Sequence, residues 1–395
     1  MYGHQNSRTP DHFDIRRCAV LSILELERKV VKTDLCTNCG ACQGMCPYWK
    51  SCDGRTFVDY ECDRKEGRCK YFCPRMPSDL KALADKFFPA EDFVPELGTV
   101  KDLYLTRAAD PAIRDGAQHG GTMTALVKLA LEEGFIDAAV LSKAGELEGS
   151  AEQTGTLNPA GVLVTDPEEV AGCKGSSFQI PPTLAVLNEA LKDDEYKKIG
   201  VVGTPCKTLA TYKMMAKPFE DNDNHADNIG MVFGLFCGWG LDWKGMDALG
   251  DAAHVDILPS KFHRMDMDDR QVDQDDVLPL VRKNCNYCYD MTAEFADLSV
   301  GGARSSEGWD VDKGWNQLIV RSDKGAALVA LAREKGVLEF REFGDEDAKA
   351  AAMDKLKKAS ASKKAKAVAA LKEMTERDDL NYLEPSRELF EEFCK

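Results

Sequence analysis

The sequence lacks any uncharged apolar run of the length that a transmembrane helix needs, about 20 residues. Residues 1–17 also lack the apolar stretch of a secretory signal peptide. Positive charge is scarce: 51 Lys and Arg residues stand against 67 Asp and Glu residues, a formal net charge of −16 at pH 7. Such a chain repels nucleic acid and anionic membranes. We therefore expect a cytoplasmic protein with no transmembrane span and no nucleic-acid partner.

No G-x-G-x-x-G turn stands between an expected strand and an expected helix, so the sequence does not support a standard dinucleotide-binding fold. Cysteine, by contrast, is abundant, at 15 of 395 residues. A secreted disulfide scaffold could hold as many, but such scaffolds are usually short. In a chain of this length, the spacing of the cysteines decides what they do.

The first cysteine group has the spacing of bacterial ferredoxins. Cys36, Cys39, Cys42 and Cys46 follow the pattern C-x2-C-x2-C-x3-C-P. Two residues between ligands allow a tight loop to aim several thiolates at one four-iron cluster, and we expect Gly40 to let the backbone approach the inorganic sulfides. Zinc sites prefer paired cysteines separated by a longer gap, so this spacing favours iron–sulfur over zinc or disulfides.

A second cysteine group follows directly, at Cys52, Cys62, Cys69 and Cys73. In two-cluster ferredoxins the fourth cysteine of each run binds the other cluster. That exchange predicts two ligand sets: Cys36, Cys39, Cys42 and Cys73 for the first cluster, and Cys46, Cys52, Cys62 and Cys69 for the second. Six residues separate Cys62 from Cys69, which departs from the ferredoxin pattern. The spacing therefore leaves open both the ligands of the second cluster and the second cluster itself.

Four further cysteines stand where α/β proteins often place their sites. Cys206 and Cys237 each follow an expected strand, and Cys285 and Cys288 form a C-x2-C pair. The two strand ends could lie side by side at the carboxyl edge of a sheet. Four thiolates there could hold a third cluster, while a structural zinc or buried free cysteines remain alternatives. The cysteines without such partners, expected to be ordinary thiols, are Cys18, Cys173 and Cys394.

The rest of the chain predicts a mixed α/β fold. Short β-rich runs alternate with helical segments, which is typical of an α/β domain. The expected strands are 102–106, 138–142, 199–203 and 230–236, and the expected helices are 122–133, 181–191 and 207–215. The predicted organisation is an N-terminal helix in 1–34, a ferredoxin-like module in 35–80, a linker in 81–100, the α/β domain in 101–345 and an exposed helical extension in 346–395.

Two glycine-rich segments could hold a phosphate-bearing cofactor. Residues 118–124 open an expected helix, where backbone N–H groups attract anions, and residues 297–302 form a second such turn. Taken alone, a glycine pair is more often a tight turn than a site. His119 could donate a proton to a bound cofactor, or be a loop histidine bonded to backbone. Lys174 could neutralise a phosphate or simply lie on the surface.

Several short motifs occur in a fixed order from about residue 100 to 342. They are Gln118-His119-Gly120-Gly121-Thr122, Cys173-Lys174-Gly175-Ser176-Ser177, Gly203-Thr204-Pro205-Cys206, Phe236-Cys237-Gly238, Cys285-Asn286-Tyr287-Cys288, Ala296-Asp297-Leu298-Ser299-Val300-Gly301, and Gly314-Trp315-Asn316 with Val320-Arg321. In this combination the chain resembles the beta-subunit family of coenzyme F420 hydrogenase, F420H2 dehydrogenase and formate dehydrogenase. Some members of that family also carry an N-terminal ferredoxin module.

The resemblance implies a flavin enzyme. Family members bind FAD beside an iron–sulfur cluster, exchange hydride with the deazaflavin coenzyme F420, and pass single electrons to the clusters. By this resemblance Cys206, Cys237, Cys285 and Cys288 hold the cluster nearest FAD. His119 is our candidate catalytic residue because of its place in the glycine-rich loop, not because of the resemblance. The residues expected around FAD are Gln118, His119, Gly120, Gly121, Thr122, Thr124, Lys174, Ser176, Ser177, Gly203, Thr204, Pro205, Asp297, Ser299, Gly301 and Gly302. The chain would then carry FAD and three 4Fe–4S clusters and exchange electrons with a partner subunit.

Two positions depart from many relatives: His119 stands where serine is frequent, and Gly175 stands where an aromatic residue often follows the lysine. These departures leave the hydride carrier open between F420 and NAD(P)H. A further alternative is a non-catalytic electron-transfer adaptor of a hydrogenase, a formate dehydrogenase or a heterodisulfide-reductase-like complex. A reductase of a tetrapyrrole or of sulfite is less expected, because no further cysteine set for sirohaem is evident.

Overall fold

The computed structural model describes residues 21–384, apart from residues 53, 61, 116, 144–158, 177, 193–194, 217–223, 243–254, 259–260, 265–270, 306–307 and 377–382. Ser177, Cys18 and Cys394 therefore lie outside the described residues, as does most of the expected N-terminal helix. Its described part is α1 (Ser22–Leu26), which continues as the π-helical turn η1 (Glu27–Val31).

The N-terminal module packs short elements around its cysteines. The strands β1 (Trp49–Cys52) and β2 (Arg55–Val58) form an antiparallel hairpin, and α2 (Arg68–Phe72) follows. The side chains at its core are Ile23, Leu26, Val30, Leu35, Trp49, Cys69 and Met76, and five more cysteines pack against them. Most cysteines of this module thus pack in or against its hydrophobic interior.

An eight-stranded mixed sheet forms the centre of the molecule, in the order β16-β6-β15-β14-β10-β9-β7-β8. Its strands are β6 (Asp102–Ala108), β7 (Ala138–Lys143), β8 (Ala160–Val164), β9 (Ile199–Gly203), β10 (Ile229–Leu235), β14 (Leu298–Gly302), β15 (Asn316–Val320) and β16 (Leu338–Arg341). The four central strands β14, β10, β9 and β7 run parallel, and the outer strands pair antiparallel. All four strands expected from the sequence are confirmed, within two residues at their ends.

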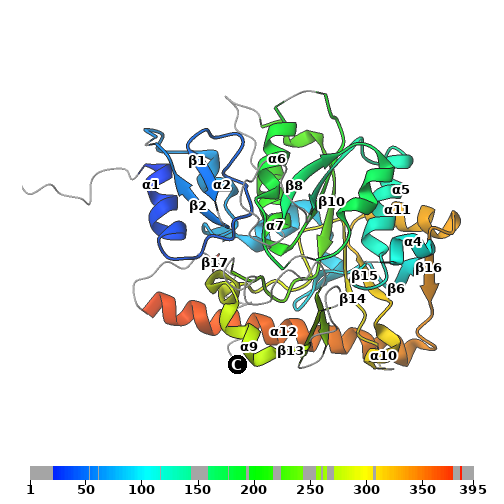
Figure 1. The fold of residues 1–395 in the computed structure, drawn as a ribbon. Coiled ribbons are helices and arrows are strands. Elements are labelled where there is room, and N and C mark those ends of the chain that lie inside the picture. Colours follow the sequence, from blue (N-terminus) through cyan, green and yellow to red (C-terminus); the bar gives the residue numbers. More distant parts are fainter. Residues whose placement is uncertain are drawn as a thin grey trace, which may run out of the picture.

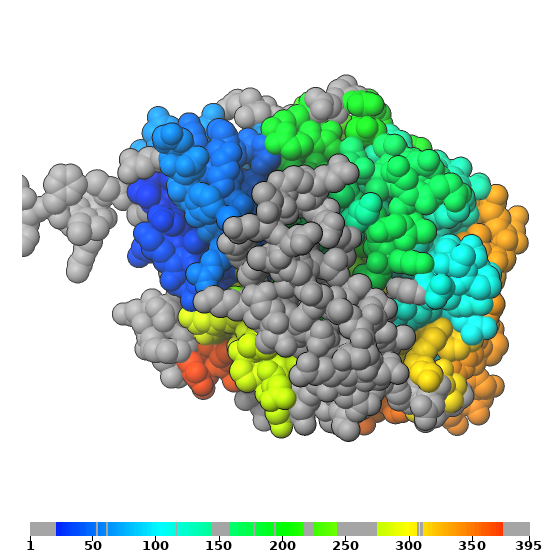
Figure 2. Space-filling model, viewed as in Figure 1, coloured from blue at the N-terminus to red at the C-terminus, as the bar shows by residue number. Residues whose placement is uncertain are grey.

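Helices cover both faces of the sheet (Figure 1). The helices α5 (Thr122–Glu132) and α11 (Asp323–Glu334) pack on one face. The other face carries α3 (Leu80–Phe87), α6 (Thr183–Ala190) and α7 (Pro205–Ala216). The three expected helices are therefore confirmed as α5, α6 and α7. Figure 2 shows the N-terminal module, in blue, directly against the green segment that contains α6 and α7.

Shorter elements connect these layers. Small sheets are formed by β4 (Phe93–Val94) with β5 (Gly98–Thr99), by β17 (Leu383–Glu384) with β3 (Ser78–Asp79), and by β11 (Val255–Leu258), β12 (Lys261–Arg264) and β13 (Gln271–Asp273). The short helices are η2 (Ala90–Asp92), α4 (Pro111–Arg114), η3 (Pro167–Cys173), η4 (Ala226–Asn228), α9 (Gln274–Val277), η5 (Leu278–Leu280), η6 (Lys283–Tyr287) and α10 (Trp309–Asp312).

Two expectations about connecting segments need correction. Residues 81–100 are not a bare linker: they hold most of α3, whose first turn is capped by the Asp79 carboxylate accepting the Ala82 N–H. The C-terminal extension forms α12 (Glu346–Glu376), which is not simply exposed. Leu356 and Leu371 are fully buried, because one stripe of this helix packs against the rest of the chain. None of the described helices is long and apolar enough to cross a membrane.

Candidate functional site

The first thiol group lies inside the N-terminal module. Burial raises the pKa of the Cys42 thiol, and the nearby thiols of Cys36, Cys39 and Cys73, together with Cys69 of the second group, raise it further. Burial also raises the pKa of Cys73 to about 11, against the opposing charge of Lys213. The four cysteines predicted for the first cluster therefore lie near one another, although Cys73 follows a different element from the other three.

The second thiol group is less complete. Cys46, Cys62 and Cys69 share one hydrophobic cluster. Burial raises the pKa of Cys69, and Cys46 adds to that rise. Cys52, by contrast, is exposed at the end of β1. The fourth expected ligand thus lies outside the buried part of the group, and the second ligand set stays a prediction.

The third thiol group forms at the carboxyl edge of the sheet. Strands β9 and β10 pair in parallel to their ends, so Cys206 after β9 and Cys237 after β10 come to the same edge, as the sequence predicted. Burial raises the pKa of Cys237, and Lys363 opposes this rise. The neighbouring thiols of Cys285 and Cys288, together with Cys206, raise it further. Four cysteines from three separate segments are thus brought together.

Helix α7 connects the first and third thiol groups. The pKa of Cys39 is raised by burial and then by the thiol of Cys206, in the first turn of α7. The next residue, Lys207, is buried, and its ammonium donates hydrogen bonds to the hydroxyls of Thr183, at 2.7 Å, and Ser142, at 3.3 Å. Burial lowers its pKa to about 8, against the opposing effect of the nearby thiols. A buried lysine therefore stands between two sets of cysteines.

The ferredoxin-like loop is docked tightly on α6. Gly40 has a φ of +89°, and a Cβ there would lie 2.5 Å from the Pro182 carbonyl oxygen and 2.6 Å from the Ala185 nitrogen. The Asn188 side chain donates to the carbonyl oxygen of Gln43 at 2.6 Å. We expected Gly40 to let the backbone approach the inorganic sulfides of a cluster. The structure shows instead that the Gly40 backbone lies close to a helix of the α/β domain.

Two arginines join the N-terminal module to η6, which carries Cys285. Arg75 donates to the Asn284 carbonyl oxygen at 2.9 Å, and Arg282 donates to the Cys36 carbonyl oxygen at 3.2 Å. Hydrogen bonds from charged donors are stronger than neutral ones. These contacts fix the first and third thiol groups relative to each other.

The predicted ligands in the thiol groups are cysteines, the donors that iron–sulfur clusters and zinc both accept, so a cluster at any of these groups stays a prediction. Within the described segments, no three His, Cys, Asp or Glu side chains converge closely enough to bind one metal ion. The thiols nevertheless lie near enough to raise one another's pKa. A four-iron cluster spreads its thiolates around a cubane, whereas zinc draws each sulfur to about 2.3 Å. Buried thiols with raised pKa values are deprotonated when they bind metal.

The two glycine-rich turns meet at the same edge of the sheet. A Cβ on Gly302, at the end of β14, would lie 2.8 Å from the His119 imidazole nitrogen Nε2. The Asn316 amide joins the turns: its oxygen accepts the Thr122 N–H at 3.2 Å, and its nitrogen donates to the Gly301 carbonyl oxygen at 3.1 Å. Bare glycine backbone beside the start of α5 suits the close approach of a cofactor phosphate. A phosphate-bearing cofactor at these turns stays a prediction.

Asp297 and Ser299 have internal partners instead. The Asp297 carboxylate accepts the Val232 N–H at 2.8 Å and the Ser322 hydroxyl at 2.6 Å. The Ser299 hydroxyl accepts a hydrogen bond from Arg321 at 3.2 Å. Both side chains are buried. The geometry gives them a structural role within the sheet and does not support the direct cofactor contact that we expected.

Other expected cofactor residues lie around the rim. Lys174 donates to the Ala112 carbonyl oxygen at 3.2 Å, on α4 just before the 118–124 turn. The Thr204 hydroxyl lies 3.4 Å from the Cys206 sulfur, so Thr204 belongs with the third thiol group. The remaining expected contacts, at Gln118, Gly120, Gly121, Thr124, Ser176, Gly203 and Pro205, stay predictions.

Sequence reasoning missed several polar residues of this region. Lys213 donates to the Cys73 carbonyl oxygen at 2.6 Å, and Lys363 donates to the Cys237 carbonyl oxygen at 2.6 Å. No local signal marks these lysines, because their partners are distant in the chain. Asn316, by contrast, stands within the Gly-Trp-Asn motif and could have been found there.

Comparison with known proteins identifies the family. Two family models, for the N-terminal and C-terminal parts of the coenzyme F420 hydrogenase/dehydrogenase beta subunit, match residues 103–188 and 196–346 respectively. The beta subunit of coenzyme F420 hydrogenase from Methanococcus voltae is 31% identical over 63% of this chain and 86% of its own. One of the subunits of the F(420)H(2) dehydrogenase from Methanosarcina mazei is 26% identical over 78% of this chain and 85% of its own.

A solved structure agrees with these matches. A chain in the xenon-derivatized F420-reducing NiFe hydrogenase complex from Methanosarcina barkeri superposes with a TM-score of 0.61 at 25% identity, over 71% of this chain and 94% of that chain. The matched ranges contain the sheet, the glycine-rich turns and the third thiol group. The chain belongs to the coenzyme F420 hydrogenase/dehydrogenase beta-subunit family.

Proposed function

We propose that this chain exchanges hydride between coenzyme F420 and a bound FAD, and passes single electrons through three 4Fe–4S clusters to or from a partner subunit. Its family consists of F420-linked beta subunits of redox complexes, and relatives are named as subunits of F420 hydrogenase, F420H2 dehydrogenase and F420-dependent formate dehydrogenase. A flavin, when bound, connects a two-electron hydride carrier with one-electron clusters.

One observation carries the proposal: the third thiol group lies at the same sheet edge as the glycine-rich turns and also next to the first thiol group. Strands β14, β10 and β9 are neighbours and parallel, and their ends carry Gly302, Cys237 and Cys206 in that order. The thiol of Cys206 in turn raises the pKa of Cys39. This arrangement supports a route for electrons from the cofactor turns through the third thiol group to the N-terminal module.

The chain's own residues have distinct tasks on this route. Asn316 holds the two glycine-rich turns at a fixed separation. His119, packed over Gly302, is the candidate for holding or moving a proton at its imidazole nitrogen Nε2. Lys207 places a buried ammonium among the thiols of the first and third groups, which offsets their negative charge when they are ionised.

An anaerobic reduction experiment tests the proposal. The purified full chain is mixed with reduced coenzyme F420 or with NADH, and flavin bleaching and cluster reduction are followed by absorbance. We expect reduced F420 to bleach the flavin and then reduce the clusters. In Cys237→Ser the flavin should still be bleached while the N-terminal clusters stay oxidised. Cys173→Ser, a partly buried cysteine of η3, is the matched control and should behave as wild type.

The alternatives give different results. If NADH bleaches the flavin and reduced F420 does not, the hydride carrier is a nicotinamide and not F420. Bleaching by neither carrier, with reduction only through a co-purified partner, would favour the non-catalytic adaptor and contradict the proposed hydride exchange.

A further inference from the structure

The C-terminal helix α12 reaches the third thiol group from outside the family-matched region. The family models end at residue 346, where α12 begins. Lys363, in the second half of this helix, donates a hydrogen bond to the Cys237 carbonyl oxygen at 2.6 Å and another to the Asp290 carbonyl oxygen at 2.8 Å. That second carbonyl also accepts the thiol of Cys288 at 3.5 Å. One ammonium therefore bridges the two segments that present Cys237 and Cys288.

Neighbouring contacts fix the position of Lys363. Ser360, one turn before it, donates to the Glu96 carbonyl oxygen at 2.5 Å, and Lys364, the next residue, forms a buried ion pair with Glu294. Leu356 and Leu371 on either side are fully buried. The helix cannot shift along its axis without breaking these contacts, so the lysine is held beside the thiol group.

The groups that face this ammonium either carry a negative charge or become negatively charged when they bind metal. They are the thiols of Cys288, Cys237 and Cys285 and the Asp290 carboxylate. A lysine is positively charged at neutral pH. When a cluster accepts one electron, its charge becomes more negative by one, and a fixed positive charge nearby in a poorly solvated site stabilises that reduced state.

We propose that Lys363 raises the reduction potential of the cluster held by Cys206, Cys237, Cys285 and Cys288, so that α12 makes this cluster a better electron acceptor. The inference rests on the proposed function, which places a cluster there. Lys363 is not a catalytic residue, since it acts on the cluster through its charge. It also gives the extension, which the family models do not include, a role beyond covering the sheet.

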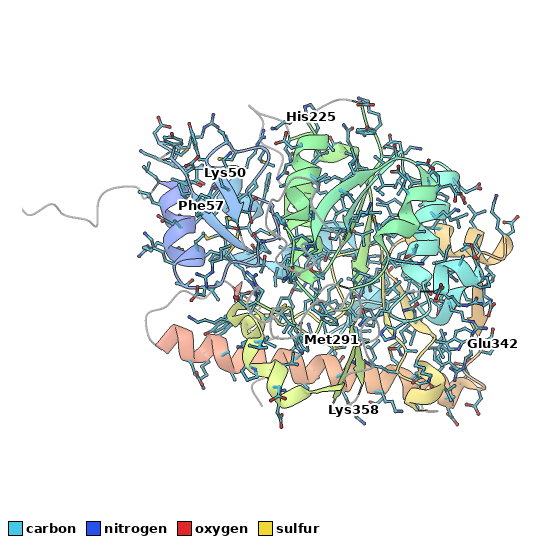
Figure 3. All side chains as sticks on the ribbon, in the orientation of Figure 1. Lys50, Phe57, His225, Met291, Glu342 and Lys358 are labelled. Atoms are coloured by element: carbon cyan, nitrogen blue, oxygen red, sulfur yellow. The ribbon has the colours of Figure 1, made fainter. Side chains whose placement is uncertain are left out.

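The test is an anaerobic potentiometric titration of the full-length holoprotein, followed by electron paramagnetic resonance, with iron measured in each sample. Lys363→Met removes the charge and the donor, Lys363→Gln removes only the charge, and Lys363→Arg keeps both. Lys358→Met is the matched control, because Lys358 lies on the outer side of the same helix with its side chain 77% exposed (Figure 3).

We expect one titration wave to shift to lower potential in Lys363→Met and Lys363→Gln, and to stay in place in Lys363→Arg and Lys358→Met. At the potential where that wave is half reduced in the wild type, the ratio of reduced to oxidised cluster should fall about tenfold, which corresponds to about 59 mV for one electron. The other waves should not move.

Three results would overturn the inference. One is an unchanged wave in both neutral variants at full iron content. Another is a normal potential in Lys363→Gln but not in Lys363→Met, which would assign the effect to hydrogen bonding. The third is loss of iron from both neutral variants, which would make the lysine structural. A wild type without iron at the third group would instead contradict the proposed function itself, and with it the inference.

Discussion

Replacing Gly40 by alanine tests how firmly the ferredoxin-like loop is docked on the α/β domain. A non-glycine residue at its φ of +89° costs roughly 1–2 kcal/mol. The added Cβ would also lie 2.5 Å from the Pro182 carbonyl oxygen and 2.6 Å from the Ala185 nitrogen, both backbone atoms of or next to α6. Forcing such an overlap costs about 1–3 kcal/mol. We expect Gly40→Ala to lower the free energy of unfolding by roughly 2–5 kcal/mol in total.

Gly54→Ala is the matched control in the same module. Gly54 has a φ of +69°, but the nearest atom to its added Cβ is a guanidinium nitrogen of Arg282, at 3.3 Å, so a shift of a few tenths of an ångström relieves the contact without breaking the hydrogen bonds of Arg282. We expect only the backbone strain there, roughly 1–2 kcal/mol. The assay is anaerobic denaturant unfolding of the full chain, followed by circular dichroism, with iron content measured in parallel. If Gly40→Ala is no more destabilising than Gly54→Ala, the docking argument is wrong.

Three further predictions concern the cofactor turns, a buried ion pair and α12. Asn316→Ala removes both hydrogen bonds between the glycine-rich turns, so it should lower the free energy of unfolding by about 1–3 kcal/mol and speed the loss of flavin on gel filtration. Unchanged flavin retention would contradict the role of Asn316 in holding the turns together. Burial raises the pKa of Glu294 to about 7 from an ordinary 4.5, so the folded chain holds a proton that the unfolded chain releases. The contribution of Glu294 to the free energy of unfolding should therefore fall by roughly 3 kcal/mol as pH rises from 4.5 through 7, so the wild type should lose more stability over this range than Glu294→Gln; equal pH slopes in both proteins would contradict the raised pKa of Glu294. Leu356→Ala should lower the free energy of unfolding by about 2–5 kcal/mol, measured by thermal or denaturant unfolding. The control, Lys358→Ala, replaces an exposed side chain and should have a negligible effect. An equally small effect of Leu356→Ala would mean that the packing of α12 does not stabilise the fold.

The sequence predicted well those features that depend on local spacing. The ferredoxin-like cysteines lie within a short loop, so their mutual approach follows from the spacing itself. Three of the four parallel strands, β7, β9 and β10, were recognisable from short apolar runs, and the ends of parallel strands share an edge, which brings Cys206 and Cys237 together. Their ligand roles remain predictions.

Features that depend on which face of an element is buried were not predictable in this way. Asp297 and Ser299 belong to a glycine-rich segment that looked like a cofactor turn, yet both side chains point to internal partners. In α12 the buried stripe includes Ser360 and Lys364, whose polarity hides the apolar periodicity that would mark a packed helix. The position of Lys363 beside Cys237 follows from that packing and from nothing local.

The metal and flavin content of the anaerobically purified full chain decides whether the three clusters and the flavin are present. With three four-iron clusters and one flavin, we expect about 12 irons, no zinc and one FAD per chain. Cys206→Ser should retain about 8 irons and the flavin, because only the third cluster is lost. A wild type with about 8 irons or fewer, or with zinc in their place, would contradict the claim that three clusters connect the flavin site to the N-terminal module.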